Sequence, residues 1–133
     1  GGYAVFPGAL GSCAAHIFDL EVGATGLTEG VAIRDGITPL IGGVSSKTRA
    51  DYYPGALPIK IKLIFDRESE LLVGGQIVGG EEVTQRINAL SFAIQKQMTT
   101  RELAKADTAY APPVCETWEP LILAAEMVLM KLR

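Results

Sequence analysis

The sequence contains few of the residues from which metal and hydrolytic sites are built, with one histidine and two cysteines among 133 residues. A structural zinc site takes four ligands, mostly Cys and His, and no acidic stretch has the spacing of a calcium-binding loop. We therefore expect no metal site. His16 is the only candidate for an imidazole base, and no Gly-x-Ser-x-Gly motif accompanies it. This disfavours a serine hydrolase, and we expect His16 to be an ordinary histidine on a helix surface.

Positive charge and long apolar runs are also scarce. The 12 Lys and Arg residues are outnumbered by 15 Asp and Glu residues, and their densest cluster is Lys60 with Lys62. Nucleic-acid binding needs a basic face, so we expect no nucleic-acid partner. No apolar run approaches the roughly 18 residues of a membrane span, so we expect no membrane partner. The separated Cys13 and Cys115 fit free thiols in the cytoplasm better than a secreted disulfide scaffold.

What is present is the composition of one globular domain. Apolar residues make up 48% of the chain and charged residues 20%, close to the globular average. At this length roughly two-thirds of the unfolded surface can be buried, so a core forms without staples. We expect residues 1–133 to form a single domain. Because the chain begins with Gly1-Gly2 rather than Met, we also expect it to be a piece of a longer protein.

The centre of the chain predicts an antiparallel sheet. Over residues 59–65, apolar residues alternate with lysines, which is typical of a half-buried strand. Residues 71–78 return as the second strand of a hairpin. Residues 40–46 predict a further strand, in which Gly42-Gly43 indicates a bulge or a close backbone approach. The Tyr-Tyr-Pro-Gly stretch at residues 52–55 predicts a turn.

Two helices are predicted before this sheet. Small and apolar residues spaced along residues 10–18 predict an N-terminal helix with Cys13 packed in the core. Glycines within residues 22–28 are expected to turn the chain. Thr28 then caps a short helix that runs through Ile33 and ends at Gly36.

Three helices are predicted after it. Glu81 and Glu82 open a helix whose apolar stripe ends near Met98, and Thr99 with Glu102 matches a capping box. An extended loop at Pro112-Pro113 precedes a final helix over residues 119–132, with Thr117 as a possible N-cap. The predicted class is α+β, with a central antiparallel meander sheet flanked by N-terminal and C-terminal helices.

The final helix is apolar nearly all the way round. A helix of this kind must be buried on several sides, and in so small a chain we expect another subunit or another domain to supply part of the cover. Its main stripe consists of Leu121, Ile122, Ala125, Val128, Leu129 and Leu132, and Ala124, Met127 and Met130 widen it.

Two motifs of possible chemistry remain. The glycines between Gly74 and Gly80 lead from a strand to a helix, but they match neither a dinucleotide fingerprint nor a phosphate-binding loop, so we expect no cofactor-binding residue. Cys115 lies in a loop before a helix N-terminus, which activates thiols, whereas Glu116 and Glu119 oppose activation. A packed thiol is favoured, and a catalytic Cys115 stays an open alternative.

The loops also carry aromatic residues: Tyr52, Tyr53, Tyr110 and Trp118. Aromatic side chains in such places build interfaces or line ligand clefts, although ordinary half-buried aromatics are the simpler interpretation of any one of them.

An ordered set of short motifs across the chain resembles one family. It is the C-terminal domain of the NADH oxidase, NADH peroxidase and coenzyme A-disulfide reductase group of pyridine nucleotide-disulfide oxidoreductases. The motifs include Pro7-Gly-Ala-Leu-Gly11, residues 18–29, Tyr52-Tyr53-Pro54-Gly55, residues 72–79, Tyr110-Ala-Pro-Pro113 and Trp118-Glu-Pro120.

The resemblance implies a dimerisation (interface) domain in a homodimer, joined to preceding FAD- and NAD-binding domains, with residues 1–7 at the boundary. The parent would be an NADH oxidase or disulfide reductase that uses FAD and NAD(P)H, while this chain alone would bind no cofactor and be inactive. The resemblance places Tyr110, Tyr52 and Tyr53 in the lining of the partner subunit's active site. The expected dimer interface is Trp118, Leu121, Ala125, Val128 and Leu132.

Two other functions stay open at this point. One is a stand-alone dimeric binding or scaffold protein without redox activity, and the other is a small thiol enzyme that uses Cys115. Neither the terminal electron acceptor of a parent enzyme nor its choice between NADH and NADPH can be derived from these residues.

Overall fold

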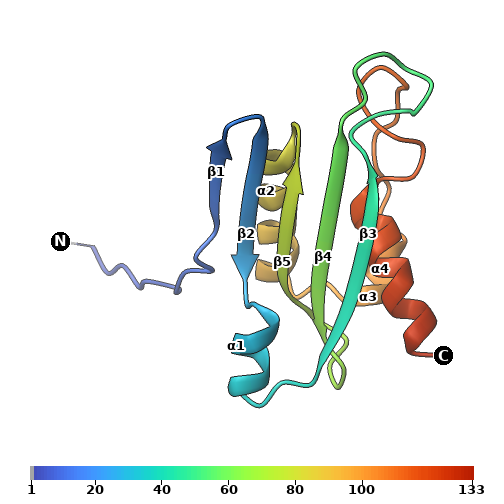
Figure 1. Cartoon of the computed structure of the whole chain (residues 1–133). Coiled ribbons are helices and arrows are strands. Elements are labelled where there is room, and N and C mark those ends of the chain that lie inside the picture. The colour runs from blue at the N-terminus through green and yellow to red at the C-terminus, as the bar shows by residue number, and fades with distance from the viewer. Residues whose placement is uncertain (1) are drawn as a thin grey trace.

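The computed structural model describes residues 2–133, which form five strands and four helices (Figure 1). The strands make one antiparallel sheet in the order β1-β2-β5-β4-β3. This confirms the predicted α+β class and the meander of β3, β4 and β5. The strands are β1 Cys13–Ile17, β2 Leu20–Gly26, β3 Pro39–Lys47, β4 Pro58–Asp66 and β5 Leu72–Gly79, and the helices are α1 Glu29–Arg34, α2 Val83–Gln95, α3 Thr100–Ala104 and α4 Pro120–Lys131.

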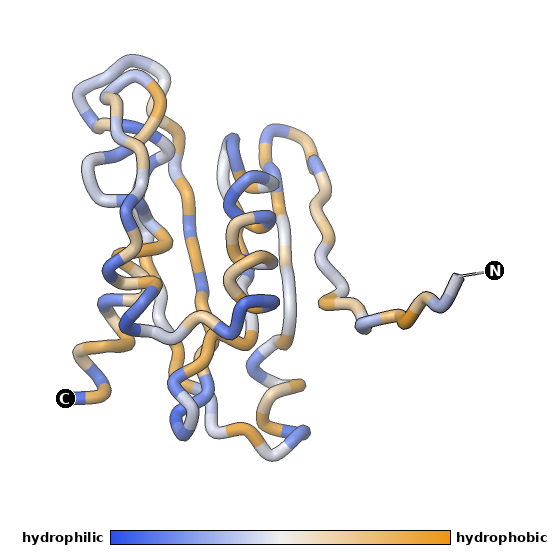
Figure 2. Tube along the Cα trace, turned by 180° about the vertical axis from the view of Figure 1, so that it is seen from behind, coloured by the Kyte–Doolittle hydropathy of each residue, from blue (hydrophilic) through white to orange (hydrophobic). Residues whose placement is uncertain are grey.

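The core lies between the sheet and two helices on one of its faces. α2 packs on β2 and β5, and α4 packs on β3 and β4, so that both helices stand in front of the strands when the molecule is seen from behind (Figure 2). The alternation of β4 is confirmed, because Ile61 and Leu63 are buried while Lys60 is exposed. Each fully buried aliphatic side chain of this kind contributes about 1.5–3 kcal/mol.

The close approach predicted at Gly42 is confirmed. A Cβ atom at this position would overlap the carbonyl oxygen of Ala124 in α4 and lie 2.8 Å from Cγ2 of Val128. The backbone of β3 therefore touches the backbone of α4, which only glycine permits.

The predicted N-terminal helix is wrong. Residues 13–17 form strand β1, which pairs with β2 through a two-residue turn in which Phe18 has a φ of 53°. β1 is an edge strand with both faces exposed, so its small residues need no strict alternation, and their spacing imitated a helical stripe. Cys13 is consequently exposed rather than packed, and His16 lies on a strand opposite Glu21. The glycines of residues 22–28 continue β2 instead of turning the chain, with Gly26 ending it at a φ of 67°.

The segment before β1 has no helix or strand, and Gly1 lies outside the described residues. Hydrogen bonds of Leu10 and Ser12 hold this segment to the domain. The Gly26 amide donates to the Leu10 carbonyl at 3.0 Å, and the Ser12 hydroxyl lies 2.7 Å from that of Thr25 and 2.8 Å from that of Ser91.

The helices α1 to α4 start within two residues of the positions predicted from the sequence, but one predicted cap is wrong. Thr28 caps α1, and Thr99 with Glu102 forms the predicted capping box of α3. The cap of α4 is Glu119, so the prediction of Thr117 is wrong. α2 begins after Glu82, whose side chain caps nothing, and a carboxylate of β2 acts in its place: Glu21 Oε2 accepts the Val83 amide at 2.8 Å.

Candidate functional site at the loop end of the sheet

Two loops lie together at one end of the sheet, where β3 turns into β4 and where α3 leads to α4 (Figure 1). We call them the 48–57 loop and the 105–119 loop. They carry all four of the aromatic residues singled out from the sequence. The hydroxyl groups of Tyr52 and Tyr110 are 3.5 Å apart, at the long limit of a hydrogen bond. The structure thus brings together two of the three predicted lining tyrosines, and Tyr53 lies beside them in the turn.

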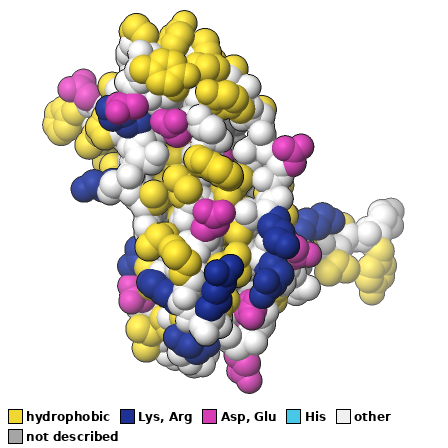
Figure 3. All heavy atoms as spheres, turned by 90° about the vertical axis from the view of Figure 1, so that its right-hand side faces the viewer, with side chains coloured by type: hydrophobic (Ala, Val, Ile, Leu, Met, Phe, Trp, Pro, Cys, Tyr) yellow, Lys and Arg dark blue, Asp and Glu magenta, His cyan; other side chains and the backbone are white. Residues whose placement is uncertain are grey.

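These aromatic side chains are open to solvent. Tyr52 is 76% exposed, Tyr110 48% and Trp118 60%. Figure 3 shows hydrophobic side chains gathered over this end of the molecule, whereas Lys and Arg gather toward the opposite end of the same face. An exposed group of aromatic residues with polar tips is typical of a surface that contacts another molecule.

The hydroxyl of Tyr110 raises the pKa of Tyr52, since it bonds to the neutral phenol. Slight desolvation and the nearby Glu116 carboxylate act in the same direction. Tyr52 is therefore protonated throughout the physiological range. Because one proton of the pair lies between the two hydroxyls, the other is free to donate a hydrogen bond to a ligand, and Tyr52 does not act as a base.

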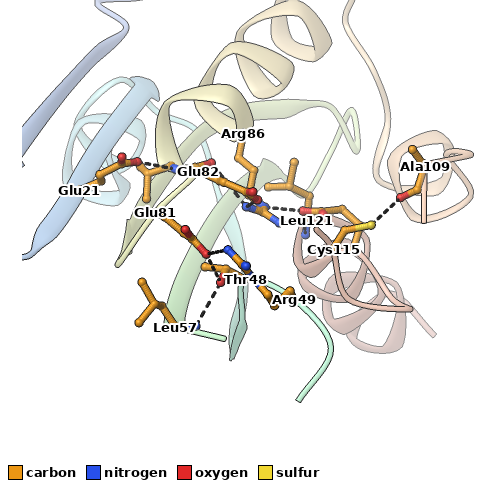
Figure 4. Close-up of polar contacts among 12 residues, drawn as sticks. Glu21, Thr48, Arg49, Leu57, Glu81, Glu82, Arg86, Ala109, Cys115 and Leu121 are labelled. Carbon is orange, nitrogen blue, oxygen red and sulfur yellow. Dashed lines mark hydrogen bonds and ion pairs between the residues drawn. The ribbon is translucent and has the colours of Figure 1, made fainter. Parts of the chain in front are cut away.

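The 48–57 loop is tied to the start of α2. Glu81 accepts the Thr48 hydroxyl at 2.9 Å and forms an ion pair with Arg49 (Figure 4). Thr48 also closes the base of the loop, because its hydroxyl accepts the Leu57 amide at 3.1 Å and its own amide donates to the Leu57 carbonyl at 2.9 Å.

The 105–119 loop is tied to the same helix by a buried ion pair. Arg86 donates from Nε to Glu119 Oε1 at 2.7 Å and from Nη2 to Oε2 at 3.1 Å, and its Nη1 contacts Glu82 at 3.3 Å (Figure 4). Burial opposes the charge on Arg86, but the two carboxylates outweigh it and raise the pKa of its guanidinium. Arg86 is thus a permanent cation between two anions.

Cys115 closes the tip of this loop. Its Sγ accepts the Ala111 amide at 3.0 Å and donates to the Ala109 carbonyl at 3.3 Å, away from Arg86 (Figure 4). The side chain borders a cavity of about 390 Å³, which α2 and the start of α4 also line with Arg86, Glu119 and Leu121. The thiol therefore has a structural role in the loop, and a catalytic role for Cys115 stays a hypothesis.

The structure divides the predicted interface residues of α4 into two groups. Leu121, Ala125 and Val128 are buried in the core of this chain, against the sheet, so their side chains are not available to a partner. Trp118 is exposed, and Leu132 is half-buried at the edge of the core. The free surface of the helix is instead formed by Met127 and Met130, at 40% and 58% exposure.

Sequence analysis missed the ionic residues that hold the two loops. The i, i+4 spacing of Glu82 and Arg86 was a signal for one ion pair. Glu119 lies 33 residues further along the chain, and nothing in the sequence connects it to Arg86.

The residues present do not fit a dinucleotide or a metal. The space beside the glycines of β5 is occupied by this chain's own atoms. A Cβ at Gly74 would overlap the backbone of Leu27, and one at Gly75 would lie 2.7 Å from Leu90. These two glycines therefore leave no room for a phosphate beside the strand. Residues 2–133 contain no group of three or more His, Cys, Asp or Glu side chains placed for a metal ion. Within the same range, every helix is too short or too polar to span a bilayer.

Comparison with known proteins gives consistent matches. The family described as "Pyridine nucleotide-disulphide oxidoreductase, dimerisation domain" matches residues 13–122. The chain is 50% identical over 123 residues to an NADH oxidase of Methanocaldococcus jannaschii and 38% identical over 123 residues to a CoA-dependent NAD(P)H sulfur oxidoreductase of Pyrococcus furiosus. Both alignments cover 92% of this chain, but only 27% and 28% of those proteins.

The fold matches solved structures equally well. An NAD-dependent persulfide reductase from A. fulgidus superposes with a TM-score of 0.93 and 40% identity, over 98% of this chain and 24% of that one. The chain thus spans about a quarter of the length of the proteins it resembles. The fold, the ordered motifs and the matched range agree with the resemblance seen in the sequence, and this chain belongs to the dimerisation-domain family of the pyridine nucleotide-disulphide oxidoreductases.

Proposed function

We propose that this chain is the interface domain of an FAD- and NAD(P)H-dependent oxidoreductase of the NADH oxidase or coenzyme A-disulfide reductase type. In this proposal a homodimer forms through the interface domain, and the two loops that carry Tyr52, Tyr53 and Tyr110 help to wall the active site of the partner subunit. FAD- and NAD-binding domains of the same polypeptide complete the enzyme. The free thiols Cys13 and Cys115 suit the cytoplasm, where we place the protein.

The observation that carries the proposal is the exposed aromatic group at the loop end. A pair of phenol hydroxyls 3.5 Å apart lies at the surface of a domain whose described residues contain no group of side chains placed for a metal ion. Such a pair can orient a substrate or a thiol by donating hydrogen bonds, and it can exclude water from a neighbouring reaction centre. Relatives named for NADH oxidation and NAD(P)H-dependent sulfur reduction supply the class of reaction.

The chemistry itself belongs to the flavin. When bound by the rest of the enzyme, FAD would take a hydride from NAD(P)H and pass electrons to oxygen, peroxide or a disulfide. This chain would contribute position and hydrogen bonds, and because its residues do not hold a dinucleotide, no step of electron transfer runs through them.

The dimer surface in this proposal is the outer side of α4 together with Trp118. Met127, Met130 and Leu132 provide apolar contacts, and Trp118 extends them toward the loop end. An isologous interface that buries this surface would bring the loops of one subunit to the other.

The test is the oligomeric state and the turnover of the protein that carries this chain. We expect Trp118→Glu and Met130→Glu to convert a sedimenting dimer into monomers and to reduce NADH turnover. Ile33→Glu is the matched control, because Ile33 is as exposed as Met130, at 58%, but lies on α1. A dimer that survives both Trp118→Glu and Met130→Glu contradicts the assigned surface.

The mass of the native polypeptide separates the proposal from the scaffold alternative. A species several times heavier than 14.1 kDa, detected with an antibody against this domain, supports an interface domain within a flavoenzyme. A native species of about this mass would instead favour a stand-alone binding protein.

A further inference from the structure

The 105–119 loop needs an external support. It joins α3 to α4 without a helix or strand of its own, yet it carries Tyr110. Loops of this length without secondary structure are uncommon in compact domains and often functional. A side chain placed on such a loop is precise only if the loop is fixed by contacts outside it.

Arg86 supplies this support where the loop ends. Its side chain is only 8% exposed, and it grips both carboxylate oxygens of Glu119. Glu119 is also the N-cap of α4, with Oε1 accepting the Leu121 amide at 3.4 Å. A bidentate pair fixes the plane of the carboxylate as well as its distance. Because apolar side chains of equal volume often stabilise a core as well as a buried ion pair does, the particular contribution of Arg86 is orientation.

Nearer to Tyr110, the same loop is held by hydrogen bonds of its own. Cys115, four residues before Glu119, hydrogen-bonds to Ala109 and Ala111, the two neighbours of Tyr110. The Val114 and Cys115 amides also donate to the Ala111 carbonyl at 2.9 and 3.0 Å. The backbone on both sides of Tyr110 is thereby held in one closed turn.

The partner tyrosine is held from the same helix. Glu81, which directly precedes Glu82 and the first turn of α2, fixes the 48–57 loop through Thr48 and Arg49. Residues 81–86 therefore contact both loops, one through Glu81 and the other through Arg86 (Figure 4).

We propose that the start of α2 is the common support of the tyrosine pair, with Arg86 as a positioning residue that sets Tyr110 against Tyr52. Arg86 does not touch a substrate in this arrangement, and it acts through Glu119. The consequence for turnover rests on the function proposed above, whereas the consequence for the geometry of the pair does not.

The experiment uses the protein that carries this chain, with 3-fluorotyrosine at position 52 read by ¹⁹F NMR over a pH titration. Because the Tyr110 hydroxyl raises the pKa of Tyr52, displacement of Tyr110 lowers it. We expect Arg86→Met to lower the pKa of the label. Arg86→Lys, which keeps the charge but cannot form a bidentate pair, should restore it in part. Arg34→Met is the control, because Arg34 is exposed and pairs only with the adjacent Asp35 among the described residues.

The same variants are assayed for NADH-dependent reduction of coenzyme A disulfide. We expect the KM for the disulfide to rise about tenfold in Arg86→Met with little change in kcat, since a misplaced contact group weakens binding. A lowered pKa of the label at position 52 with unchanged kinetics agrees with the proposed role of α2 but contradicts the lining role of the tyrosines. An unchanged pKa in a folded Arg86→Met protein overturns the positioning inference, whatever the kinetics show. If Arg86→Met does not fold, Glu119→Gln replaces it, because Gln keeps the shape of the Glu119 side chain and removes its charge. An unchanged pKa of the label at position 52 in that variant also overturns the inference.

Discussion

The contact between Gly42 and α4 gives a sharp test of how the domain is packed. In Gly42→Ala, the new methyl group would overlap the Ala124 carbonyl oxygen and lie 2.8 Å from Val128 Cγ2. The Val128 side chain can adjust, but the helix backbone cannot, so α4 must move from the sheet by on the order of 1 Å. We therefore expect the free energy of unfolding to fall.

The magnitude follows from two opposing contributions. Overpacking of a core costs about 1–3 kcal/mol, and the displaced helix also loses part of the burial of Leu121 and Val128. Replacing glycine in a strand returns about 0.5–1 kcal/mol, because alanine has less freedom in the unfolded chain. We expect a net loss of about 2 kcal/mol, which lowers the Tm of a domain of this size by roughly 7 °C.

Gly43→Ala is the control, since it changes the adjacent residue of the same strand in the same way. A Cβ at Gly43 meets only the Ile61 carbonyl, at 3.9 Å, so this variant should be neutral or slightly stabilised. Thermal unfolding followed by circular dichroism measures both. If Gly42→Ala melts within about 2 °C of the parent protein, the close packing of β3 on α4 is refuted.

Three further outcomes test individual contacts. Glu21→Gln should lower the Tm by about 3 °C, because the Val83 amide of α2 then loses a charged acceptor worth about 1 kcal/mol. The control Glu68→Gln, at an exposed position, should leave the Tm unchanged. The Ser69 hydroxyl, 2.6 Å from Asp66, and the amides of Glu68 and Ser69 lower the pKa of Asp66. Their contribution to stability is therefore present above the ordinary carboxyl pKa near 4, and it is lost as the pH falls through the pKa of the folded state. Ser69→Ala should therefore flatten the acid limb of a stability profile measured by urea unfolding from pH 6 to pH 2, and an unchanged profile would disprove the contact. Cys115, engaged in hydrogen bonds within its loop, should react with iodoacetamide more slowly than exposed Cys13, as followed by peptide mass spectrometry; faster alkylation of Cys115 would revive the thiol-enzyme alternative.

Local patterns in the sequence were sufficient for β4 and for the caps of α1 and α3. Burial on one side forces the alternation of β4, and the Thr99 capping box depends on residues three positions apart. The hairpin of β1 and β2 was missed because β1 is an exposed edge strand made of small residues, where neither period is enforced. The strands β3, β4 and β5 could be predicted from the sequence because their burial imposes a pattern on the residues.

The site depends on contacts that no local pattern encodes. Tyr52 and Tyr110 are 58 residues apart, and they meet because the turn from β3 to β4 lies at the same end of the sheet as the start of α4. Arg86 and Glu119 are 33 residues apart and also come together only in the folded chain. The aromatic character of the loops could be predicted from the sequence, whereas their juxtaposition and their support by α2 required the structure.

The apolar character of α4 combines two separate demands on one helix. Its inner side packs against the sheet, through Ala125, Val128 and the backbone contact at Gly42. Its outer side remains exposed at Met127 and Met130, and its first residue follows Glu119, the carboxylate held by Arg86. In the proposed dimer, a partner that covers the methionines would therefore contact the same helix whose N-cap, Glu119, is held by Arg86.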